Sequence, residues 1–264
     1  MIRIVDPDDP RIAIYRNVRD RDLQGRAGCF LAEGEVVLRV LLSGASRFRA
    51  ASVLLSDTRA DALAAWLAAT APDLPAFVAD DGLLEAIAGF PIHRGVLAAG
   101  LRQDARDADA VLAAPEGAAV ALGLVGIANH DNTGGLFRNA AAFGASAVLL
   151  DNACCDPLYR KAIRVSVGAC LTVPFAKGGS PGEIVARLRW AEFEVFALSP
   201  SGREELGTFA WPARTALLVG AEGAGLPTDI LARVRTVAIR MANGFDSLNV
   251  ATASGIALHS ITRP

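Results

Sequence analysis

The stretch IRMANGFDSLNV, residues Ile239–Val250, joins an apolar run typical of a β-strand to an apolar run typical of a helix. In α/β proteins a loop between a buried strand and a helix N-terminus is a common ligand site, because the first N–H groups of the helix have no partner within it. Ser247 and Asn249 flank Leu248 in this loop, and both are residue types that cap helices. The stretch alone therefore leaves two interpretations open, a helix cap and a ligand site.

Outward from this stretch, the second half of the chain alternates between strand and helix patterns. Apolar runs predict strands at 120–127, 147–150, 172–175, 195–198, 216–219 and 236–239. Helical patterns lie at 136–143, 160–170, 181–190, 228–234 and 248–261. Strands that are apolar along their whole length indicate a parallel sheet that is covered on both faces. We therefore expect one α/β domain over residues 118–264.

The first part of the chain predicts a smaller α/β domain over residues 1–104. Helical patterns at 35–42, 61–69 and 81–88 alternate with strand patterns at 52–55, 76–78 and 95–99, which indicates βαβ units in three layers. Residues 105–117 are rich in charge and alanine, and we interpret them as a linker.

Composition excludes several classes of protein. The 264 residues are 52% hydrophobic and 20% charged, which is too apolar for a disordered chain. No apolar run is long enough to predict a membrane span, and the start of the chain lacks the pattern of a signal peptide, so we expect a cytoplasmic protein. The four cysteines and three histidines show no metal-ligand spacing, and we expect no metal. The net charge of −2 argues against a broad nucleic-acid surface but not against a local basic patch.

A second candidate site is NTGGLFRNAAAFG, residues 132–144, which we interpret as a Gly-rich loop that opens a helix after a strand. Such a helix start can hold an anion, but the segment lacks the lysine of a P-loop. Arg138 either packs its stem while its head reaches solvent, or serves the site.

Two more segments combine polar groups with glycine. CCDPLYRKAIRVSVGAC, residues 154–170, contains a basic cluster that either contacts phosphate or is a solvated face. LLVGAEGAGLP, residues 217–227, has Glu222 as its only charge, either as a cap for the next helix or as a site residue. In residues 1–26, Arg16 and Arg26 belong to a set of arginines that is either a solvated helix face or an RNA-backbone contact.

Four motifs, which follow one another along the chain, resemble the motifs of one protein family. They are NxGxxxRxAxxFG at 132–144, DPxxxKAIRxSxGA at 156–169, GAEGxGL at 220–226 and SLNV at 247–250. Together they resemble the SpoU-type, TrmH-like RNA ribose 2′-O-methyltransferases of the SPOUT class. FLAEG at 30–34 and HRGVLA at 93–98 are similar to the substrate-binding domain that this family carries.

The resemblance implies a parallel-sheet domain with a deep trefoil knot, an arrangement that is rare in proteins, preceded by a small α/β substrate-binding domain. It implies methyl transfer from S-adenosylmethionine to a ribose 2′-hydroxyl of structured rRNA or tRNA, by a homodimer whose subunits both contribute to the site. The catalytic positions it implies are Arg138, Asn132, Glu222, Ser247 and Asn249, and the cofactor-binding positions are Gly220, Ile239 and Leu248. Arg164 and Ser166 match positions expected to hold RNA, and Arg16 and Arg26 are further RNA candidates.

Two alternatives stay open beside this reading. One is an RNA-binding protein on the same fold that has lost catalysis, and the other is a base-methylating enzyme of the SPOUT class. The chain also departs from the family pattern twice. Arg240 stands where proline is common, and Asn129-His130 stands where Asp-Pro is usual. We expect the first departure to affect the rigidity of the cofactor loop.

Overall fold

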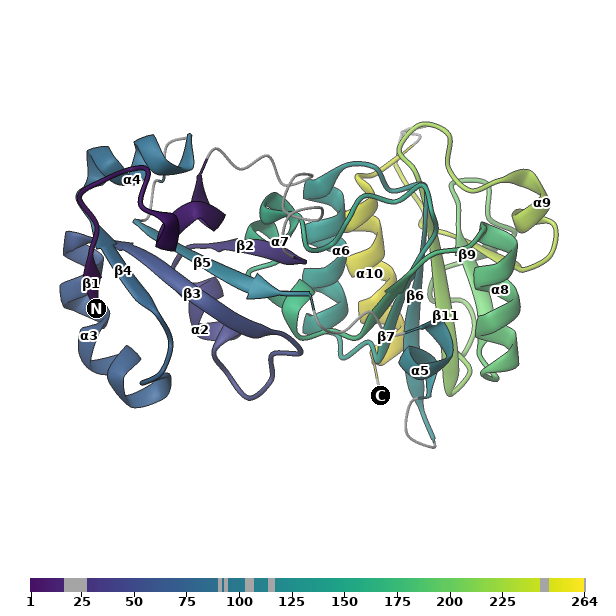
Figure 1. The fold of residues 1–264 in the computed structure, drawn as a ribbon. Coiled ribbons are helices and arrows are strands. Elements are labelled where there is room, and N and C mark those ends of the chain that lie inside the picture. Colours follow the sequence, from purple (N-terminus) through teal and green to yellow (C-terminus); the bar gives the residue numbers. More distant parts are fainter. Residues whose placement is uncertain are drawn as a thin grey trace. The chain divides into compact units, whose positions relative to one another are not determined.

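The computed structural model describes residues 1–16, 28–89, 92, 95–102, 107–113, 117–242 and 247–263. The chain forms two units (Figure 1). The first unit comprises Met1–Asp104 together with Leu158–Thr172, and the second comprises Ala105–Pro157 together with Val173–Pro264. A short segment from the second half of the sequence is therefore built into the first unit.

The first unit contains a five-stranded mixed sheet in the order β1-β4-β3-β5-β2. β1, β4 and β3 run parallel, whereas β5 pairs antiparallel with both β3 and β2. The βαβ pattern predicted from sequence thus holds for β3 and β4 but not for β5. The strands are β1 (Ile2–Arg3), β2 (Cys29–Glu33), β3 (Arg49–Ser56), β4 (Ala76–Ala79) and β5 (Val96–Leu101).

Helices of the first unit begin at side-chain caps where the sequence supplies them. Ser56 accepts a hydrogen bond from the main chain of Arg59 at the start of α3, and Asp80 accepts one from Leu83 at the start of α4. Gly89 ends α4 in the left-handed conformation with φ of 75°. The helices are η1 (Pro10–Tyr15), α2 (Glu35–Leu41), α3 (Asp57–Thr70) and α4 (Asp81–Ala88).

The segment that joins the first unit from the second half of the chain forms two short helices. These are α7 (Arg160–Val165) and the 3-10 helix η2 (Ala169–Leu171). The single helix predicted over 160–170 is wrong, because Val167 and Gly168 have positive φ values of 55° and 86°. A side chain at Gly168 would lie 3.0 Å from Val40, so the bend between the helices needs glycine for space as well as for conformation.

The second unit is built on a seven-stranded sheet in the order β10-β12-β9-β11-β6-β7-β8, and every pairing in it is parallel. The predicted parallel sheet is confirmed. The strands are β6 (Ala119–Val125), β7 (Ala147–Leu150), β8 (Phe175–Lys177), β9 (Glu194–Leu198), β10 (Glu204–Glu205), β11 (Arg214–Gly220) and β12 (Arg235–Ala238).

Helices cover both faces of this sheet (Figure 1). α6 (His130–Ala142) and α10 (Val250–Thr262) lie side by side on one face. α5 (Ala108–Leu112), α8 (Pro181–Trp190) and α9 (Thr228–Leu231) pack on the other face, where they enclose a core of alternate strand residues. α5 falls within the predicted linker, yet its Val111 and Leu112 are buried in that core. Within the described residues, no helix has the length and apolar character needed to cross a bilayer.

Candidate functional site

The candidate site lies at the edge of the second sheet where its parallel strands end. The segments that follow β6, β11 and β12 all leave the sheet at this edge, which is where open α/β sheets bind ligands. They carry the three motifs that the sequence singled out, at residues 132–144, 220–226 and 247–250.

The segment after β6 turns into α6 earlier than the sequence predicted. Asn129 caps the helix, because its Oδ1 accepts a hydrogen bond from the main chain of Asp131 at 2.8 Å. Residues 132–135, predicted to form a loop, are therefore the first turns of α6. Asn132 is consequently buried, with 6% of its surface exposed. Asn129, which caps the helix, belongs to the Asn129-His130 pair where the chain departs from its family pattern.

Glycine and asparagine in α6 let α10 approach it closely. A Cβ on Gly135 would lie 2.7 Å from the Cβ of Ala251, too close for any side chain. One turn further on, Asn139 Nδ2 donates hydrogen bonds to the carbonyl oxygen of Ala251 at 2.5 Å and to Ser254 Oγ at 2.9 Å. The N-terminus of α10 is thereby fixed against α6.

Asn249 connects the three segments of the site. Its Nδ2 donates to Asn132 Oδ1 at 2.9 Å and to Glu222 Oε1 at 3.0 Å. Its Oδ1 accepts from the main chain of Ala251 at 2.9 Å and of Thr252 at 3.3 Å, so Asn249 is also the cap of α10. Both protons and the oxygen of this one amide are used, which holds all three polar groups in one arrangement.

The turn after β11 that carries Glu222 is closed by glycine. A Cβ on Gly220 would lie 2.3 Å from the carbonyl carbon of Gly225, and Ala221 forms an isolated β-bridge with Gly225. Gly223 and Gly225 have positive φ values of 81° and 67°, which glycine adopts without strain. The tight turn brings the Glu222 carboxylate to Asn249.

Ile239 and Leu248 border the segment that gave the first sequence signal. Ile239 is half-buried and Leu248 is exposed. In the part of the chain that the structure describes, neither residue's main chain makes a hydrogen bond. Ser247 is exposed and is not the cap of α10, because Asn249 occupies that position.

Arg138 lies on α6 six residues after Asn132, with its side chain exposed. Among the described residues it has no hydrogen-bonding or ion-pair partner. Its guanidinium donors are thus not committed to the fold of the chain.

The predicted RNA contacts at 160–166 have structural partners in the first unit. Glu33 is 3% exposed and accepts from both Arg160 and Arg164, with Arg164 Nη1 3.2 Å from Glu33 Oε2. Ser166 is 2% exposed, and its hydroxyl donates to the carbonyl oxygen of Ile163 at 2.9 Å. A direct contact of Ser166 with RNA is therefore inconsistent with its burial.

Sequence reasoning missed Glu33, although one signal was present. Glu33 is the only charged residue in the strand CFLAE, and a carboxylate inside a buried strand needs a cationic partner. Of the other RNA candidates, Arg16 pairs with Asp8 at 2.8 Å, and Arg26 lies outside the described residues.

The thiols of Cys154 and Cys155 have raised pKa values. Burial raises the pKa of the Cys154 thiol to about 12, and its Sγ donates to the carbonyl oxygen of Leu124 at 3.3 Å. Burial also raises the pKa of the Cys155 thiol, which lies 3.0 Å from Thr133 Oγ1. Both thiols stay protonated at neutral pH. Across the described residues, no cluster of three or more His, Cys, Asp or Glu side chains could hold a metal ion.

Arg240, which stands where the family commonly has proline, has an acidic neighbour on β10. Its Nε lies 3.4 Å from Glu205 Oε1, and both side chains are exposed. Such an exposed ion pair contributes about 0–1 kcal/mol to stability.

Known proteins resemble this chain over nearly its whole length. A relative from Mycobacterium bovis, an uncharacterized tRNA/rRNA methyltransferase, is 38% identical over 271 residues, which cover 98% of this chain and 91% of the relative. The 23S rRNA (guanosine-2′-O-)-methyltransferase RlmB of Ralstonia nicotianae is 31% identical over 198 residues, covering 74% of this chain and 80% of that enzyme.

Solved structures share the fold. The AdoMet-bound rRNA methyltransferase of Sinorhizobium meliloti superimposes with a TM-score of 0.81 at 22% identity, covering 98% of this chain and 96% of that one. The SpoU methyltransferase AviRb of Streptomyces viridochromogenes, in complex with AdoMet, gives a TM-score of 0.81 at 22% identity, with coverage of 96% and 97%. The model of the SpoU rRNA Methylase family matches residues 119–259, which contain all three segments of the candidate site. The chain therefore belongs to the SpoU rRNA methylase family.

Proposed function

We propose that this protein transfers a methyl group from S-adenosylmethionine to a ribose 2′-hydroxyl of rRNA or tRNA. The observation that carries the proposal is the convergence of Asn132, Glu222 and Asn249 from three separate segments at the C-terminal edge of the sheet. Family membership supports methyl transfer to RNA, and the activity in the name of the RlmB relative supports the 2′-position.

The residues at the edge fit S-adenosylmethionine. The main-chain groups of Ile239 and Leu248 have no partners in the described chain, so they are available to the amino and ring nitrogens of a nucleoside. The apolar side chains of the same two residues offer a surface for an adenine ring. The turn at Gly220 leaves no room for a side chain, because the main chain of Gly225 packs against it and closes the turn that carries Glu222. When bound, the cofactor supplies an electrophilic methyl group on a positively charged sulfur.

The chain's own residues would then align the ribose and assist loss of its proton. A guanidinium is an unfavourable general base, because it keeps its proton in proteins, so we favour another role for Arg138. We propose that it grips the phosphate next to the target ribose, since its donors are uncommitted within the described residues. A positive charge there lowers the cost of negative charge developing on the 2′-oxygen.

Asn132, Glu222 and Asn249 would hold the three segments of the site in place. Ser247 would face the substrate. Because the Asn249 amide is fully used, it holds Glu222 and the start of α6 together. Holding reactants in line is worth an effective molarity of roughly 10⁵–10⁸ M in favourable cases. The network therefore contributes by positioning rather than by exchanging protons.

The rest of the molecule has proposed roles too. We propose that the first unit, residues 1–104 with 158–172, binds the RNA substrate, with the arginine-rich start of the chain, including Arg16 and Arg26, as one contact. Arg164 would contact RNA only by sharing its guanidinium with Glu33. We propose a cytoplasmic location, which agrees with an RNA substrate.

We also propose a trefoil knot and a homodimer. β12 lies second from one edge of the sheet, next to β10, and the chain after it leads to α10, which contacts β11 and lies beside α6. This return across β9 supports threading of the final segment. Exposed Leu248 and Ile256 support an interface at α10 between two copies of the chain. Light scattering after size-exclusion chromatography, with Ile256→Asp as the interface variant, tests the dimer. A single monomeric mass for the wild-type protein would contradict it.

The experiment that tests the proposed function separates cofactor binding from methyl transfer. Arg138→Ala should bind S-adenosylmethionine with the wild-type Kd in calorimetry, but its transfer of labelled methyl to RNA should fall by about 10²-fold or more. Arg138→Lys keeps the charge without the planar fork and should recover only part of the rate. Arg187→Ala, which removes an exposed arginine of α8 paired with Asp109, is the control and should stay active. Wild-type transfer by Arg138→Ala would contradict the role of Arg138.

A further inference from the structure

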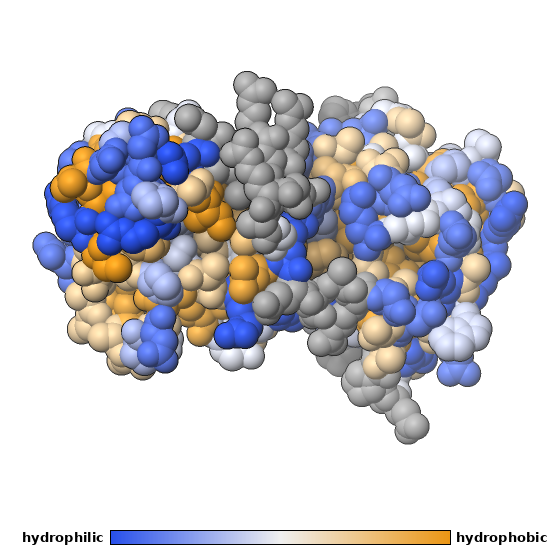
Figure 2. Space-filling model, viewed as in Figure 1, coloured by the Kyte–Doolittle hydropathy of each residue, from blue (hydrophilic) through white to orange (hydrophobic). Residues whose placement is uncertain are grey.

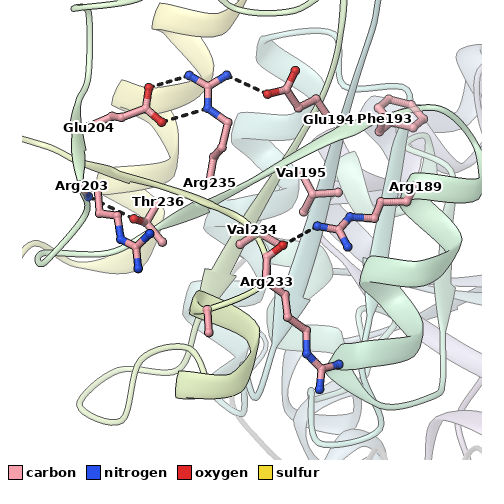
Figure 3. A pocket seen from close by; sticks show the side chains of 11 residues that line it. Arg189, Phe193, Glu194, Val195, Arg203, Glu204, Arg233, Val234, Arg235 and Thr236 are labelled. Atoms are coloured by element: carbon pink, nitrogen blue, oxygen red, sulfur yellow. Dashed lines mark hydrogen bonds and ion pairs between the residues drawn. The ribbon is translucent and has the colours of Figure 1, made fainter.

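A cavity lies in the second unit, at the edge of the sheet opposite to the candidate site. It has a volume of about 510 Å³ and is lined where β9 and β12 begin, by the end of α8, the start of β10 and the residues between α9 and β12 (Figure 3). The Asn132–Glu222–Asn249 network stands at the other end of the same parallel strands. Since β11 has seven residues, about 20 Å of sheet separates the two edges.

Four arginines line this cavity, and one of them is committed to the fold. Arg235 donates from Nε to Glu204 Oε1 at 2.9 Å and from Nη1 to Glu194 Oε1 at 2.7 Å (Figure 3). Its guanidinium also lies 4.6 Å from the centre of the Phe196 ring. Arg235 thus satisfies both carboxylates of the cavity.

The other three arginines keep most of their donors. The main chain of Arg203 is anchored by a hydrogen bond to Thr236 Oγ1 at 3.0 Å, but its guanidinium has no partner among the described residues. Arg189 donates to the carbonyl oxygen of Arg233, which is neutral and leaves the charge of Arg189 uncompensated. Within the described residues, the guanidinium of Arg233 has one ion-pair partner, Asp229 at 3.8 Å, and both side chains are exposed. Figure 3 shows these three side chains around the cavity, on either side of Val234.

This set of groups selects for an anion with several oxygens. Each guanidinium carries five N–H donors in a planar fork, which matches the oxygens of phosphate. Sites for apolar small molecules are lined mainly by hydrophobic side chains. This cavity is lined mainly by charged side chains, so it offers an apolar ligand little to contact. Hydrophilic side chains gather over α8 and α9 on the face of this unit seen in Figure 2.

We propose that the cavity formed by Arg189, Arg203 and Arg233 binds phosphates of the RNA backbone, as a second contact for RNA whose target ribose lies at the opposite edge. The proposal rests on the proposed function, because it takes RNA as the substrate. A strand that rises about 3.4 Å per nucleotide needs roughly six nucleotides to reach across 20 Å. The cavity therefore serves structured RNA of some length and adds affinity without reading sequence.

The test uses the full chain with Arg203 and Arg233 both replaced by alanine. Fluorescence anisotropy with a labelled 30-nucleotide RNA hairpin measures Kd over a range of KCl concentrations. We expect the Kd to rise about 10-fold at low salt, and the slope of log K against log salt to fall by about 1 to 2, because two phosphate contacts are lost. The Kd for S-adenosylmethionine should not change, which shows that the variant is folded.

Two controls make the result specific. Arg187→Ala removes a charge from α8, the helix that carries Arg189, at a position outside the cavity, and should leave RNA affinity within about 2-fold. Arg203→Lys with Arg233→Lys keeps the charge and should restore most of the salt slope. Calorimetry with 5′-AMP separates RNA from a free phosphate ligand. Loss of AMP binding in the double alanine variant with unchanged RNA affinity would assign the cavity to a mononucleotide and overturn the proposal.

The outcomes also separate this proposal from the proposed function. Wild-type RNA affinity and salt slope in the double alanine variant overturn the cavity assignment and leave methyl transfer standing. A wild-type protein that binds RNA through the cavity but transfers no methyl group overturns the function and leaves the cavity standing. Absence of RNA binding by the wild-type protein at every salt concentration overturns the cavity assignment as well.

Discussion

At the scale of the residue, Asn249 combines two structural roles that are usually carried by separate residues. It caps α10 through its oxygen, and it joins Asn132 to Glu222 through its nitrogen. The sequence left a helix cap and a ligand site as alternatives for this position. The geometry allows both at once, because the acceptor and the donors of one amide serve different partners.

Replacement of Asn249 by aspartate separates the capping role from the role in the hydrogen-bond network. Asn249→Asp keeps the capping oxygen but loses both donors and sets a second carboxylate against Glu222. We expect stability within about 1 kcal/mol of wild type in urea denaturation and methyl transfer reduced by about 10- to 100-fold. Asn249→Ala should lose both properties.

Ser180→Ala is the matched control for the cap. Ser180 caps α8 in a capping box with Glu183, away from the candidate site, so this variant should lose about 1 kcal/mol of stability and no activity. If Asn249→Asp were as active as Ser180→Ala, the network would not be part of the site.

Residues that contact distant parts of the chain were the hardest to predict. Ser166 and Arg164 were expected to contact RNA because they match positions of the family motif that are expected to hold RNA. The guanidinium of Arg164 instead bonds to Glu33, which is 131 positions away, and the hydroxyl of Ser166 is buried and donates to the carbonyl oxygen of Ile163. Local sequence carries no information on which buried carboxylate a basic residue will meet.

At the scale of the element, the contact between α6 and α10 decides the shape of the site. Helix existence was predictable from apolar spacing, and the bounds predicted for α4, α8 and β7 are confirmed. The start of α6 was not predictable, because NTGG contains glycines that favour a loop. The conformational cost of glycine in a helix is offset by close packing of α6 on α10. This packing requires a residue without a side chain at Gly135.

Substitution of Gly135 tests that contact. Gly135→Ala places a methyl group 2.7 Å from Ala251, so we expect a loss of about 1–3 kcal/mol in the free energy of unfolding and weaker binding of S-adenosylmethionine. Gly182→Ala is the same substitution in α8, where the nearest atoms are 4.0 Å away, and should leave stability equal or slightly higher. Equal stability of the two variants would show that α6 and α10 are not tightly packed.

At the scale of the whole molecule, the two units do not correspond to two continuous stretches of sequence. Residues 158–172 lie within the region that matches the SpoU family, yet they belong to the first unit. The parallel sheet of the second unit was predictable from apolar runs such as β7 and the centre of β6, whereas the two-residue strand β10, Glu204–Glu205, has no apolar residue and was missed. The antiparallel β5 in the first sheet was not predictable, since the strand pattern does not record direction.

Glu33 helps to tie residues 158–172 into the first unit through Arg160 and Arg164, and its removal should destabilise that unit. Glu33→Ala leaves Arg160 and Arg164 without their buried carboxylate, so we expect a loss of about 3 kcal/mol in urea denaturation. Glu35→Ala removes a more exposed carboxylate that pairs with Arg39 and Arg59, and should cost less than about 1 kcal/mol. Equal losses for the two variants would contradict a special role for Glu33.

The central claim, transfer of a methyl group to a ribose 2′-oxygen, is tested most directly by locating the methyl group. The protein is incubated with rRNA and tRNA and with S-adenosylmethionine labelled in its methyl group, and the RNA is then hydrolysed in alkali. Alkaline cleavage needs a free 2′-hydroxyl, so a 2′-O-methylated position survives as a dinucleotide. We predict that the label appears in alkali-resistant dinucleotides and is lost with Arg138→Ala. Label in mononucleotides would mean base methylation, and absence of label with bound cofactor would mean an RNA-binding protein without catalysis; either result contradicts the account.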